Sequence, residues 1–263
     1  MAQNFANKVV IITGSSSGIG QAAAILFAKS GASVTIHGRS EDGIKKTMDL
    51  ILEAGIPKER THSVRGGVSE EKTLKALIDE TIQKFGRLDV LVNNVGIAGK
   101  EGEQNARSME NLDYVLDVNL KSVIHLTELA IPHLEKTKGN IISVSSIGSQ
   151  KTNTSVPFYC IAKAALDHFA RNYAAILAPK GIRINNLNPG GTMTAFMSRH
   201  GIPTEVIEKA VKNYNIPLGR WAAPSEMGEF IIFMASEKAS YMTGQCINVD
   251  GGSLIDSPTI KFD

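Results

Sequence analysis

Three residues of this chain, Ser146, Tyr159 and Lys163, are of types that could together donate a proton to a carbonyl oxygen. Tyr159 and Lys163 are four residues apart, so in a helix they share one face. A phenol with a pKa of about 10 exchanges protons poorly at neutral pH. A neighbouring ammonium, near the positive end of a helix dipole, favours the phenolate and should lower that pKa. Ser146 offers a neutral hydroxyl to hold the substrate oxygen, so the three residues predict a general acid for carbonyl reduction.

The Tyr-x-x-x-Lys pattern alone is weak, because it arises by chance in roughly one chain in three of this composition. Without support from the rest of the chain, the favoured interpretation is Tyr159 as a half-buried packing residue and Lys163 as a solvated charge. The local sequence is nevertheless arranged as the catalytic interpretation requires, and the rest of the chain decides between the two. An apolar run at 140–144 indicates a buried strand that ends just before Ser146. Pro157 is favoured at the first position of a helix, which would put Tyr159 in the first turn.

A glycine-rich turn follows the first strongly apolar segment of the chain. Residues 8–13 form a continuous β-branched run, which is typical of a strand buried on both faces. Residues 14–20 read G-S-S-S-G-I-G and lead into a helical pattern from Ala22 to Lys29. A second strand is expected at 32–37. In such a unit of strand, turn, helix and strand, the turn and the helix N-terminus bind a dinucleotide pyrophosphate.

The three glycines of this turn have separate predicted roles. Gly14 makes the tight turn, Gly18 lets a pyrophosphate approach the backbone, and Gly20 lets the helix pack closely on the sheet. The spacing is G-x-x-x-G-x-G, and no Lys-Ser or Lys-Thr pair follows it, which counts against a nucleoside triphosphatase.

The residues after the second strand predict which dinucleotide binds. An NAD site requires a carboxylate there to accept a hydrogen bond from the ribose 2′-hydroxyl. This chain has Gly38, Arg39 and Ser40 instead. Arg39 can pair with a 2′-phosphate in a fork geometry, and Ser40 can add a hydroxyl. The cofactor prediction is therefore NADP(H), with a solvated loop arginine as the alternative interpretation of Arg39.

Strand and helix patterns alternate along the rest of the chain. This alternation predicts one α/β domain over residues 1–263, with a doubly wound (Rossmann-like) parallel sheet of about seven strands and helices on both faces. Ligands bind beyond the carboxyl ends of such strands. A segment at about 192–217 is expected to form either a substrate lid or ordinary surface packing. The remaining strands are expected at 61–65, 88–92, 140–144, 181–188 and, with a final turn, 245–252; the remaining helices are expected at 42–54, 70–85, about 112–134, 158–178 and 224–235.

The composition excludes several classes of partner. A formal charge of +2 gives no reason to expect nucleic acid or an anionic membrane. The sequence has no apolar run of transmembrane length and no signal-peptide core at its start. Cys160 and Cys246 have no metal-binding or redox spacing, so no metal site is predicted and a reduced, cytoplasmic location is expected. The helix at 158–178 is apolar around much of its circumference, which predicts a second subunit and so a homo-oligomer.

With these residues placed, the chain resembles the short-chain dehydrogenase/reductase family in its single-domain form. The resemblance covers nearly the whole chain, from Lys8 to Gly252, and its motifs are specific in combination. These motifs are T-G-S-S-S-G-I-G at 13–20, N-N-V-G at 93–96, Asn119, Ser146, Tyr159, Lys163, N-P-G at 188–190 and D-G-G at 250–252.

The resemblance implies a catalytic tetrad. Tyr159 would protonate the alkoxide as hydride leaves the nicotinamide, and Ser146 would orient and polarise the carbonyl. Lys163 would hold the nicotinamide ribose and lower the pKa of Tyr159. Asn119 would hold a water in a proton relay. The family commonly forms tetramers, with the helices that contain Asn119 and Tyr159 at one interface.

The same resemblance implies a set of coenzyme contacts. Thr194 matches the position whose hydroxyl usually meets the carboxamide. Two positions depart from the family pattern: Gly67 stands where an aspartate usually contacts adenine, and Val95 stands where alanine is usual. The residues expected to bind coenzyme are Gly14, Ser16, Ser17, Gly18, Ile19, Gly20, Arg39, Ser40, Asn94, Gly96, Tyr159, Lys163, Pro189, Gly190, Thr192 and Thr194.

Together these observations predict an NADP(H)-dependent oxidoreductase that interconverts a ketone or aldehyde with an alcohol. Its substrate is a small molecule; steroid, sugar, quinone and small ketone all remain open. One alternative keeps bound NADP without net redox, as in an epimerase or dehydratase. Another is a non-catalytic NADP sensor, which would need neither Tyr159 nor Ser146.

Overall fold

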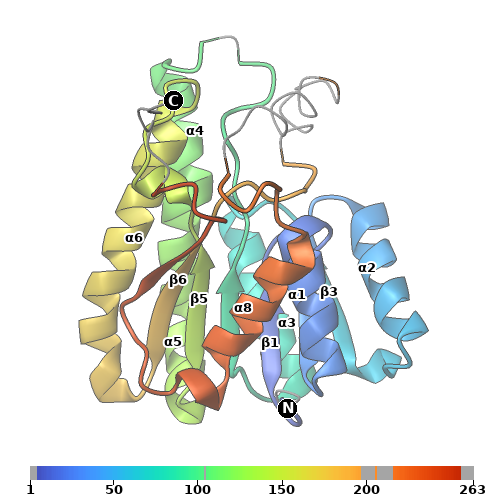
Figure 1. Ribbon diagram of the computed structural model, residues 1–263. Coiled ribbons are helices and arrows are strands. Elements are labelled where there is room, and N and C mark those ends of the chain that lie inside the picture. The colour runs from blue at the N-terminus through green and yellow to red at the C-terminus, as the bar shows by residue number, and fades with distance from the viewer. Residues whose placement is uncertain (1–4, 104, 197–204, 206–215, 256–263) are drawn as a thin grey trace.

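A parallel sheet forms the centre of the molecule (Figure 1). The computed structural model describes residues 5–103, 105–196, 205 and 216–255. Within these residues the sheet has seven strands in the order β3-β2-β1-β4-β5-β6-β7, and all neighbouring strands pair in parallel. The predicted doubly wound α/β fold is confirmed. The strands are β1 (Val9–Ile12), β2 (Ser33–Gly38), β3 (Thr61–Arg65), β4 (Val90–Asn93), β5 (Asn140–Val144), β6 (Arg183–Pro189) and β7 (Cys246–Val249).

Helices cover both faces of the sheet (Figure 1). The hydrophobic core is correspondingly divided into two clusters: α1, α2 and α8 contribute to one, and α3, α5 and α6 to the other. An all-parallel sheet requires this cover because both of its faces are apolar. The helices are α1 (Gly18–Lys29), α2 (Glu41–Glu53), α3 (Glu71–Phe85), α4 (Met109–Leu116), α5 (Ser122–Thr137), α6 (Pro157–Leu177) and α8 (Pro224–Ala235).

Strand β1 shows how the sequence produces these layers. All of its residues are buried. Val10 and Ile12 belong to the cluster that includes α1 and α8, whereas Ile11 belongs to the cluster on the opposite face. Successive side chains of a strand point to opposite faces. A continuous β-branched run therefore supplies apolar contacts to both sides, as predicted.

The order of the sheet reverses at β1, which pairs with β2 on one side and β4 on the other. The turn after β1 and the loop after β4 therefore leave the sheet side by side at its carboxyl edge, where open α/β sheets bind ligands. These segments contain residues 14–20 and 93–96, both predicted to belong to the coenzyme site.

Most helix limits lie within one residue of the prediction; the larger differences are at α1, α4 and α5. Helix α1 begins at Gly18, inside the glycine-rich stretch and four residues before the expected start. Helix α4 begins earlier than expected, at Met109, because the Ser108 side chain caps it. The expected continuous helix to residue 134 is interrupted by a π turn, Asp117–Lys121, which lies between α4 and α5 and contains Asn119.

Most of the predicted lid, at 197–204 and 206–215, lies outside the described residues. Its first residues, 192–196, follow β6, and Thr192 forms an isolated parallel bridge with Ala222. Among the residues that the structure describes, no helix combines the length and apolar character needed to cross a membrane.

Candidate active site

The glycine-rich turn after β1 adopts a backbone that glycine accommodates best. Gly14 and Gly18 have φ values of +66° and +59°, in the left-handed region that disfavours residues with a Cβ. At Gly20, a Cβ would lie 2.6 Å from the Gly14 carbonyl oxygen, so α1 could not start as close to the turn. The first N–H groups of α1 have no acceptor within the helix. A helix N-terminus that directly follows a glycine-rich turn therefore favours the binding of an anion.

The other predicted residues of this turn lie between β1 and the body of α1. Ser17 occupies the N-cap position of α1, and Ile19 packs against the core cluster on that face of the sheet. Ser16 lies against α2: a Cβ at Gly43 would be 3.1 Å from the Ser16 Cβ. The turn is therefore enclosed between two helices.

Two side chains from other elements hold the turn in place. The Asn94 amide donates to the backbone oxygens of Thr13 at 2.9 Å and Gly14 at 3.1 Å. The Thr47 hydroxyl, on α2, donates to the Ser15 oxygen at 2.9 Å. The Asn94 amide therefore supports the turn on which the coenzyme would lie, and its predicted contact with the coenzyme stays a prediction.

His37, which the sequence analysis did not single out, joins the turn to the end of β3. Its Nδ1 accepts a hydrogen bond from the Gly14 N–H at 3.1 Å, and its Nε2 lies 3.1 Å from the Gly66 carbonyl oxygen. Burial lowers the pKa of His37 to about 4, against the opposing effect of the bond to Gly66. The ring is therefore neutral at neutral pH, and its Nε2–H donates to Gly66. In the sequence, the one feature that could have pointed to His37 is its position at the end of an apolar strand.

The end of β2 carries the residues predicted to select the coenzyme. Gly38 is tightly packed, since a Cβ there would lie 2.6 Å from the Ser16 hydroxyl oxygen. Arg39 is exposed. The Ser40 hydroxyl accepts a hydrogen bond from the Gly43 N–H at 3.1 Å and caps α2. Ser40 thus has a structural role besides the coenzyme contact predicted for it.

A second arginine, Arg65, lies beside Arg39. Arg65 ends β3 and is in register with Gly38 of β2. Its Nε donates to the Arg39 carbonyl oxygen at 3.2 Å, and its guanidinium forms an ion pair with Glu41 at 2.8 Å. Sequence reasoning missed this residue because strand pairing, not proximity along the chain, brings it to the site.

The three residues of the predicted proton-transfer group meet at the carboxyl end of β5. The Ser146 hydroxyl accepts a hydrogen bond from the Gly148 N–H at 3.0 Å. A Cβ at Gly148 would lie 3.3 Å from Ser146 Oγ and 3.5 Å from Tyr159 Cε1, so the serine and tyrosine side chains lie close together. Pro157 is the first residue of α6, as predicted, so Tyr159 lies in the first turn. Lys163 Nζ lies 5.6 Å from the centre of the Tyr159 ring.

The protonation of this group differs from the expectation. Desolvation raises the pKa of Tyr159 to about 12, against the opposing hydrogen bond from Ser146. The expected lowering is wrong in direction, because it counted the nearby ammonium but not the lost hydration of a phenolate. Burial also lowers the pKa of Lys163 to about 8, against the charge of Asp167. Lys163 Nζ donates to the Val144 carbonyl oxygen at 2.7 Å.

Asn119 is fully buried within the π turn. Its Oδ1 accepts from the Ile97 N–H at 2.9 Å, and its Nδ2 donates to the Ile97 oxygen at 2.8 Å. The side chain therefore fixes the loop after β4. A Cβ at Gly96 would lie 3.5 Å from Lys163 Nζ and 3.6 Å from Asn119 Oδ1, so this glycine lies between two members of the predicted tetrad. The water-holding role of Asn119 stays a prediction.

The backbone after β6 packs closely on the turn after β7. Pro189 ends β6. A Cβ at Gly190 would lie 2.7 Å from the Asp250 Cα, and the Thr192 hydroxyl donates to the Gly190 oxygen at 3.2 Å. These contacts hold the start of the predicted lid against the sheet.

The next residues of this segment contact both halves of the site. A Cβ at Gly18 would lie 3.2 Å from the Thr194 Cγ2, so Thr194 lies over the glycine-rich turn. The Phe196 ring centre is 5.8 Å from that of Tyr159. The segment therefore connects the predicted pyrophosphate turn to the predicted general acid.

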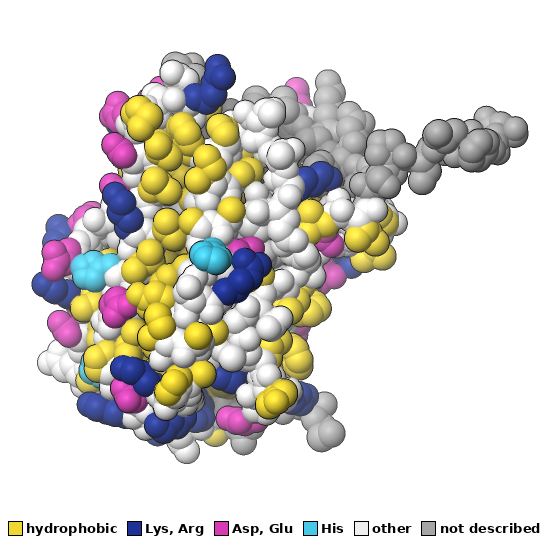
Figure 2. Space-filling view, turned by 90° about the vertical axis from the view of Figure 1, so that its left-hand side faces the viewer, with side chains coloured by type: hydrophobic (Ala, Val, Ile, Leu, Met, Phe, Trp, Pro, Cys, Tyr) yellow, Lys and Arg dark blue, Asp and Glu magenta, His cyan; other side chains and the backbone are white. Residues whose placement is uncertain are grey.

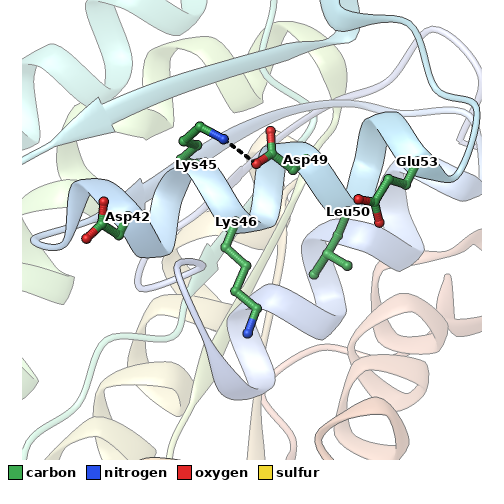
Figure 3. A pocket seen from close by; sticks show the side chains of 6 residues that line it. All are labelled: Asp42, Lys45, Lys46, Asp49, Leu50 and Glu53. Carbon is green, nitrogen blue, oxygen red and sulfur yellow. Dashed lines mark hydrogen bonds and ion pairs between the residues drawn. The ribbon is translucent and has the colours of Figure 1, made fainter.

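Two hollows lie away from this edge of the sheet. One runs along the outer surface of α2 (Figure 3), where Lys45 and Asp49 form an ion pair at 2.6 Å. The other is a groove of about 640 Å³ that includes Lys8, Asn140 and Arg183. Neither hollow contains a predicted site residue. Within the described ranges, no group of three His, Cys, Asp or Glu side chains is placed to hold a metal.

Comparison with known proteins gives matches over nearly the full length of the chain. A family model described as enoyl-(acyl carrier protein) reductase matches residues 14–253. The 3-oxoacyl-(acyl-carrier-protein) reductase FabG of Thermotoga maritima is 36% identical over 250 residues, which cover 94% of this chain and 98% of that protein.

Two solved structures extend the comparison. A short-chain dehydrogenase/reductase of unknown function from Caenorhabditis elegans, determined with cofactor, has a TM-score of 0.91 and 38% identity, covering 95% of this chain and 96% of that one. A 7α-hydroxysteroid dehydrogenase complexed with NADH and 7-oxo glycochenodeoxycholic acid has a TM-score of 0.84 and 32% identity, covering 95% of each chain.

Proposed function

Because the chain belongs to the short-chain dehydrogenase/reductase family, we propose that it is an NADP(H)-dependent oxidoreductase in which Tyr159 is the general acid for reduction of a ketone or aldehyde. The observation that carries the proposal is the placement of Tyr159 beside Ser146 at the end of β5, with Lys163 Nζ 5.6 Å from the centre of the phenol ring. This group lies at the same edge of the sheet as the glycine-rich turn.

The residues at this edge fit a dinucleotide. The turn between β1 and α1 has glycines where a Cβ would obstruct the backbone, and it ends at a helix N-terminus. We assign the pyrophosphate to this turn, the nicotinamide ribose to Lys163 and the carboxamide to Thr194. When bound, the nicotinamide supplies or accepts the hydride.

Arg39 and Arg65 support NADP(H) over NAD(H). Both guanidinium groups belong to the end of the β2–β3 pair, and Gly38 stands where a carboxylate would be needed for a ribose 2′-hydroxyl. Guanidinium groups bind phosphate in a bidentate manner and keep their charge at all relevant pH values. Of the two, Arg39 would be the main partner of a 2′-phosphate, because Arg65 is already paired with Glu41.

The chain's own residues supply the proton. A carbonyl oxygen placed between the hydroxyls of Ser146 and Tyr159 can accept a hydrogen bond from each. Since the pKa of Tyr159 is raised to about 12, the phenol is protonated and ready to act as an acid in the reductive direction. As the proton leaves, the Lys163 ammonium stabilises the phenolate that remains.

The surroundings of Tyr159 favour a substrate with an apolar group next to its carbonyl. The Phe196 ring lies beside the Tyr159 ring, as described above, and offers an apolar surface. The test is a screen of NADPH oxidation across steroid, sugar, quinone and small ketones, with alcohols run in the reverse direction. The proposal expects turnover of at least one carbonyl. Tight NADPH binding with no turnover of any compound would instead support a sensor.

We also propose that the enzyme is a cytoplasmic homo-oligomer. Figure 2 shows hydrophobic side chains gathered on the side of the molecule that α4, α5 and α6 form. Met109, Ile161 and Ile176 are 67%, 53% and 57% exposed on helices of this side, as an unpartnered interface would leave them. The free thiols of Cys160 and Cys246 suit a reducing compartment. Light scattering in solution gives the oligomeric state, and a monomer would contradict this proposal.

A further inference from the structure

A carboxylate is buried one helical turn beyond Lys163. Asp167 is 3% exposed and follows Lys163 by four residues on α6, so the two side chains leave the same face of the helix. The direct partners of the Asp167 carboxylate are amides. Removing a carboxylate from water is unfavourable, and an ion pair is the usual compensation. Hydrogen bonds from neutral groups compensate here.

Strand β6 supplies both amides. Asn186 Nδ2 donates to Asp167 Oδ1 at 2.9 Å, and Asn188 Nδ2 donates to Asp167 Oδ2 at 2.8 Å. The two asparagines are alternate residues of one strand, so they face the same side of the sheet. A carboxylate only accepts hydrogen bonds, so Asp167 determines which end of each amide faces it.

This arrangement leaves other polar atoms without partners. The Oδ1 atoms of Asn186 and Asn188 are buried and have no hydrogen-bond partner among the described residues. Such atoms disfavour folding, as does a buried charge, and an apolar trio of similar volume would avoid both. Packing alone therefore does not explain why Asp167 is buried here. An effect of its negative charge on the protonation of a neighbouring side chain does.

We propose that Asp167 is a positioning residue for the reaction: its carboxylate, fixed by Asn186 and Asn188, keeps Lys163 protonated beside Tyr159. This inference rests on the proposed function, in which Lys163 acts as an ammonium. Burial lowers the pKa of Lys163, and Asp167 opposes that effect. Without the carboxylate, a smaller fraction of Lys163 would carry a charge near neutral pH.

Other ionisable groups surround this pair. On α6, Tyr159 precedes Lys163 by one turn and Arg171 follows Asp167 by one turn. On β7, the Cys246 thiol lies 3.7 Å from the Asp167 backbone oxygen. Desolvation and the charge of Asp167 raise the pKa of Cys246 to about 12, against the effect of Arg171, so the thiol is neutral.

The remaining elements packed against α6 contribute little charge at this point: on α4, for example, Glu110 and Asp113 are exposed to solvent. On the π turn, Asp117 and Lys121 form an exposed ion pair with each other at 2.8 Å. Lys180, just beyond α6, pairs with Glu135 at 3.4 Å. On the turn after β5, Ser149 is neutral and its Oγ lies 3.1 Å from Asn188 Nδ2. Asp167 is thus the carboxylate through which the charge of Lys163 is controlled.

The first test is the pH profile of carbonyl reduction by Asp167→Asn, which removes the charge at nearly constant volume. The pH above which kcat falls should decrease by about 1 pH unit, with a loss of about fivefold at pH 8, approaching tenfold at higher pH, and little loss below pH 6. Asp167→Glu, which restores the charge, should return this pH toward its original value. The control is Cys246→Ala, which changes a side chain next to Asp167 but keeps the carboxylate. This variant should leave the pH at which kcat falls unchanged.

A second measurement does not depend on turnover. The Lys163 side chain can be titrated by ¹³C NMR in protein labelled at lysine Cε, with its signal assigned by comparison with Lys163→Arg. The titration midpoint should be lower in Asp167→Asn than in the unmodified protein. If Asp167→Asn does not fold, Asn188→Ala loosens the carboxylate and should move the midpoint in the same direction by less.

An unchanged midpoint and an unchanged pH at which kcat falls in a folded Asp167→Asn or Asn188→Ala protein would overturn the inference. The failure of the proposed function looks different. In that case the unmodified enzyme would reduce no carbonyl with NADPH, whereas the titration of Lys163 could still respond to Asp167.

Discussion

Lys163 Nζ lies 5.6 Å from the centre of the Tyr159 ring. Burial lowers the pKa of Lys163 to about 8, whereas desolvation raises the pKa of Tyr159 to about 12. The acid is therefore protonated across the physiological range, and the group that titrates near neutrality is its neighbour. In the proposed reaction, the Lys163 charge stabilises the phenolate that remains when Tyr159 gives up its proton, so we expect this charge to control the rate.

The reaction should accordingly lose activity with rising pH. Lys163 is an ammonium below about pH 8 and is neutral above it, whereas Tyr159 keeps its proton to about pH 12. We expect kcat for carbonyl reduction at saturating NADPH to be level below pH 7 and to fall about tenfold for each pH unit well above 8. A rate that rises through pH 8 would show that neutral Lys163, or ionised Tyr159, is the active form.

Arg39 should control the choice of coenzyme. Arg39→Leu removes the guanidinium assigned to the 2′-phosphate, and a charge-assisted hydrogen bond contributes about 1.5–3 kcal/mol. We expect KM for NADPH to rise roughly 10- to 100-fold, with KM for NADH nearly unchanged as the internal control. Arg65→Leu should give a smaller loss, because the Arg65 guanidinium is already paired with Glu41. Equal effects on both coenzymes would remove the role given to these arginines.

Changing the coenzyme preference from NADPH to NADH should require a substitution at Ser16 as well as at Gly38. A Cβ at Gly38 would lie 2.6 Å from the Ser16 hydroxyl oxygen. We therefore expect Gly38→Asp with Arg39→Leu to bind either coenzyme poorly, and the same pair with Ser16→Gly to prefer NADH. Coenzyme dissociation constants measured by fluorescence for the two variants decide the matter. Good NADH binding without the Ser16 change would contradict this packing argument.

His37 should make stability depend on pH. Its pKa is lowered from 6.5 to about 4 in the folded protein, so the unfolded chain binds the proton more readily between these values. The stabilisation is complete above about pH 6.5 and is lost as pH falls through about 4. We expect the free energy of unfolding in urea to decrease by about 2 kcal/mol more between pH 7 and pH 5 in the unmodified protein than in His37→Gln.

The matched control for that experiment is His168→Gln, at an exposed position on α6. This variant should keep the full acid dependence of the unmodified protein. The interpretation fails if His37→Gln and His168→Gln lose stability equally on acidification.

Asn119 tests whether an amide that fixes a loop also takes part in the chemistry. Asn119→Ala removes both hydrogen bonds to Ile97 and should lower the free energy of unfolding by about 2 kcal/mol. If the residue only supports the loop, activity measured well below the melting temperature should fall little. A large loss of kcat together with normal coenzyme binding would support the relay role instead.

Local patterns predicted the regular elements well, and the reason is visible in particular segments. Residues 61–65, 140–144 and 224–235 form the expected strand, strand and helix with the expected limits. Apolar periodicity and turn residues determine such segments through the chain itself. The π turn at Asp117–Lys121 was missed, since no local pattern distinguishes it from a continuous helix.

The parts of the site that sequence reasoning missed depend on tertiary pairing. Arg65 reaches Arg39 through the β2–β3 register, and Asp167 meets Asn186 and Asn188 across the α6–β6 contact. Periodicity shows which face of an element is buried but not which polar side chains meet there. The direction of the Tyr159 pKa was wrong for a related reason, because desolvation depends on how the completed fold covers the phenol.

The most direct test of the central claim is the kcat of Tyr159→Phe for reduction of a verified carbonyl substrate by NADPH. This variant keeps the ring beside Phe196 but removes the proton donor. We predict a loss of about 10²- to 10⁴-fold in kcat with an unchanged dissociation constant for NADPH. Turnover within a few-fold of the unmodified enzyme would show that Tyr159 is not the general acid.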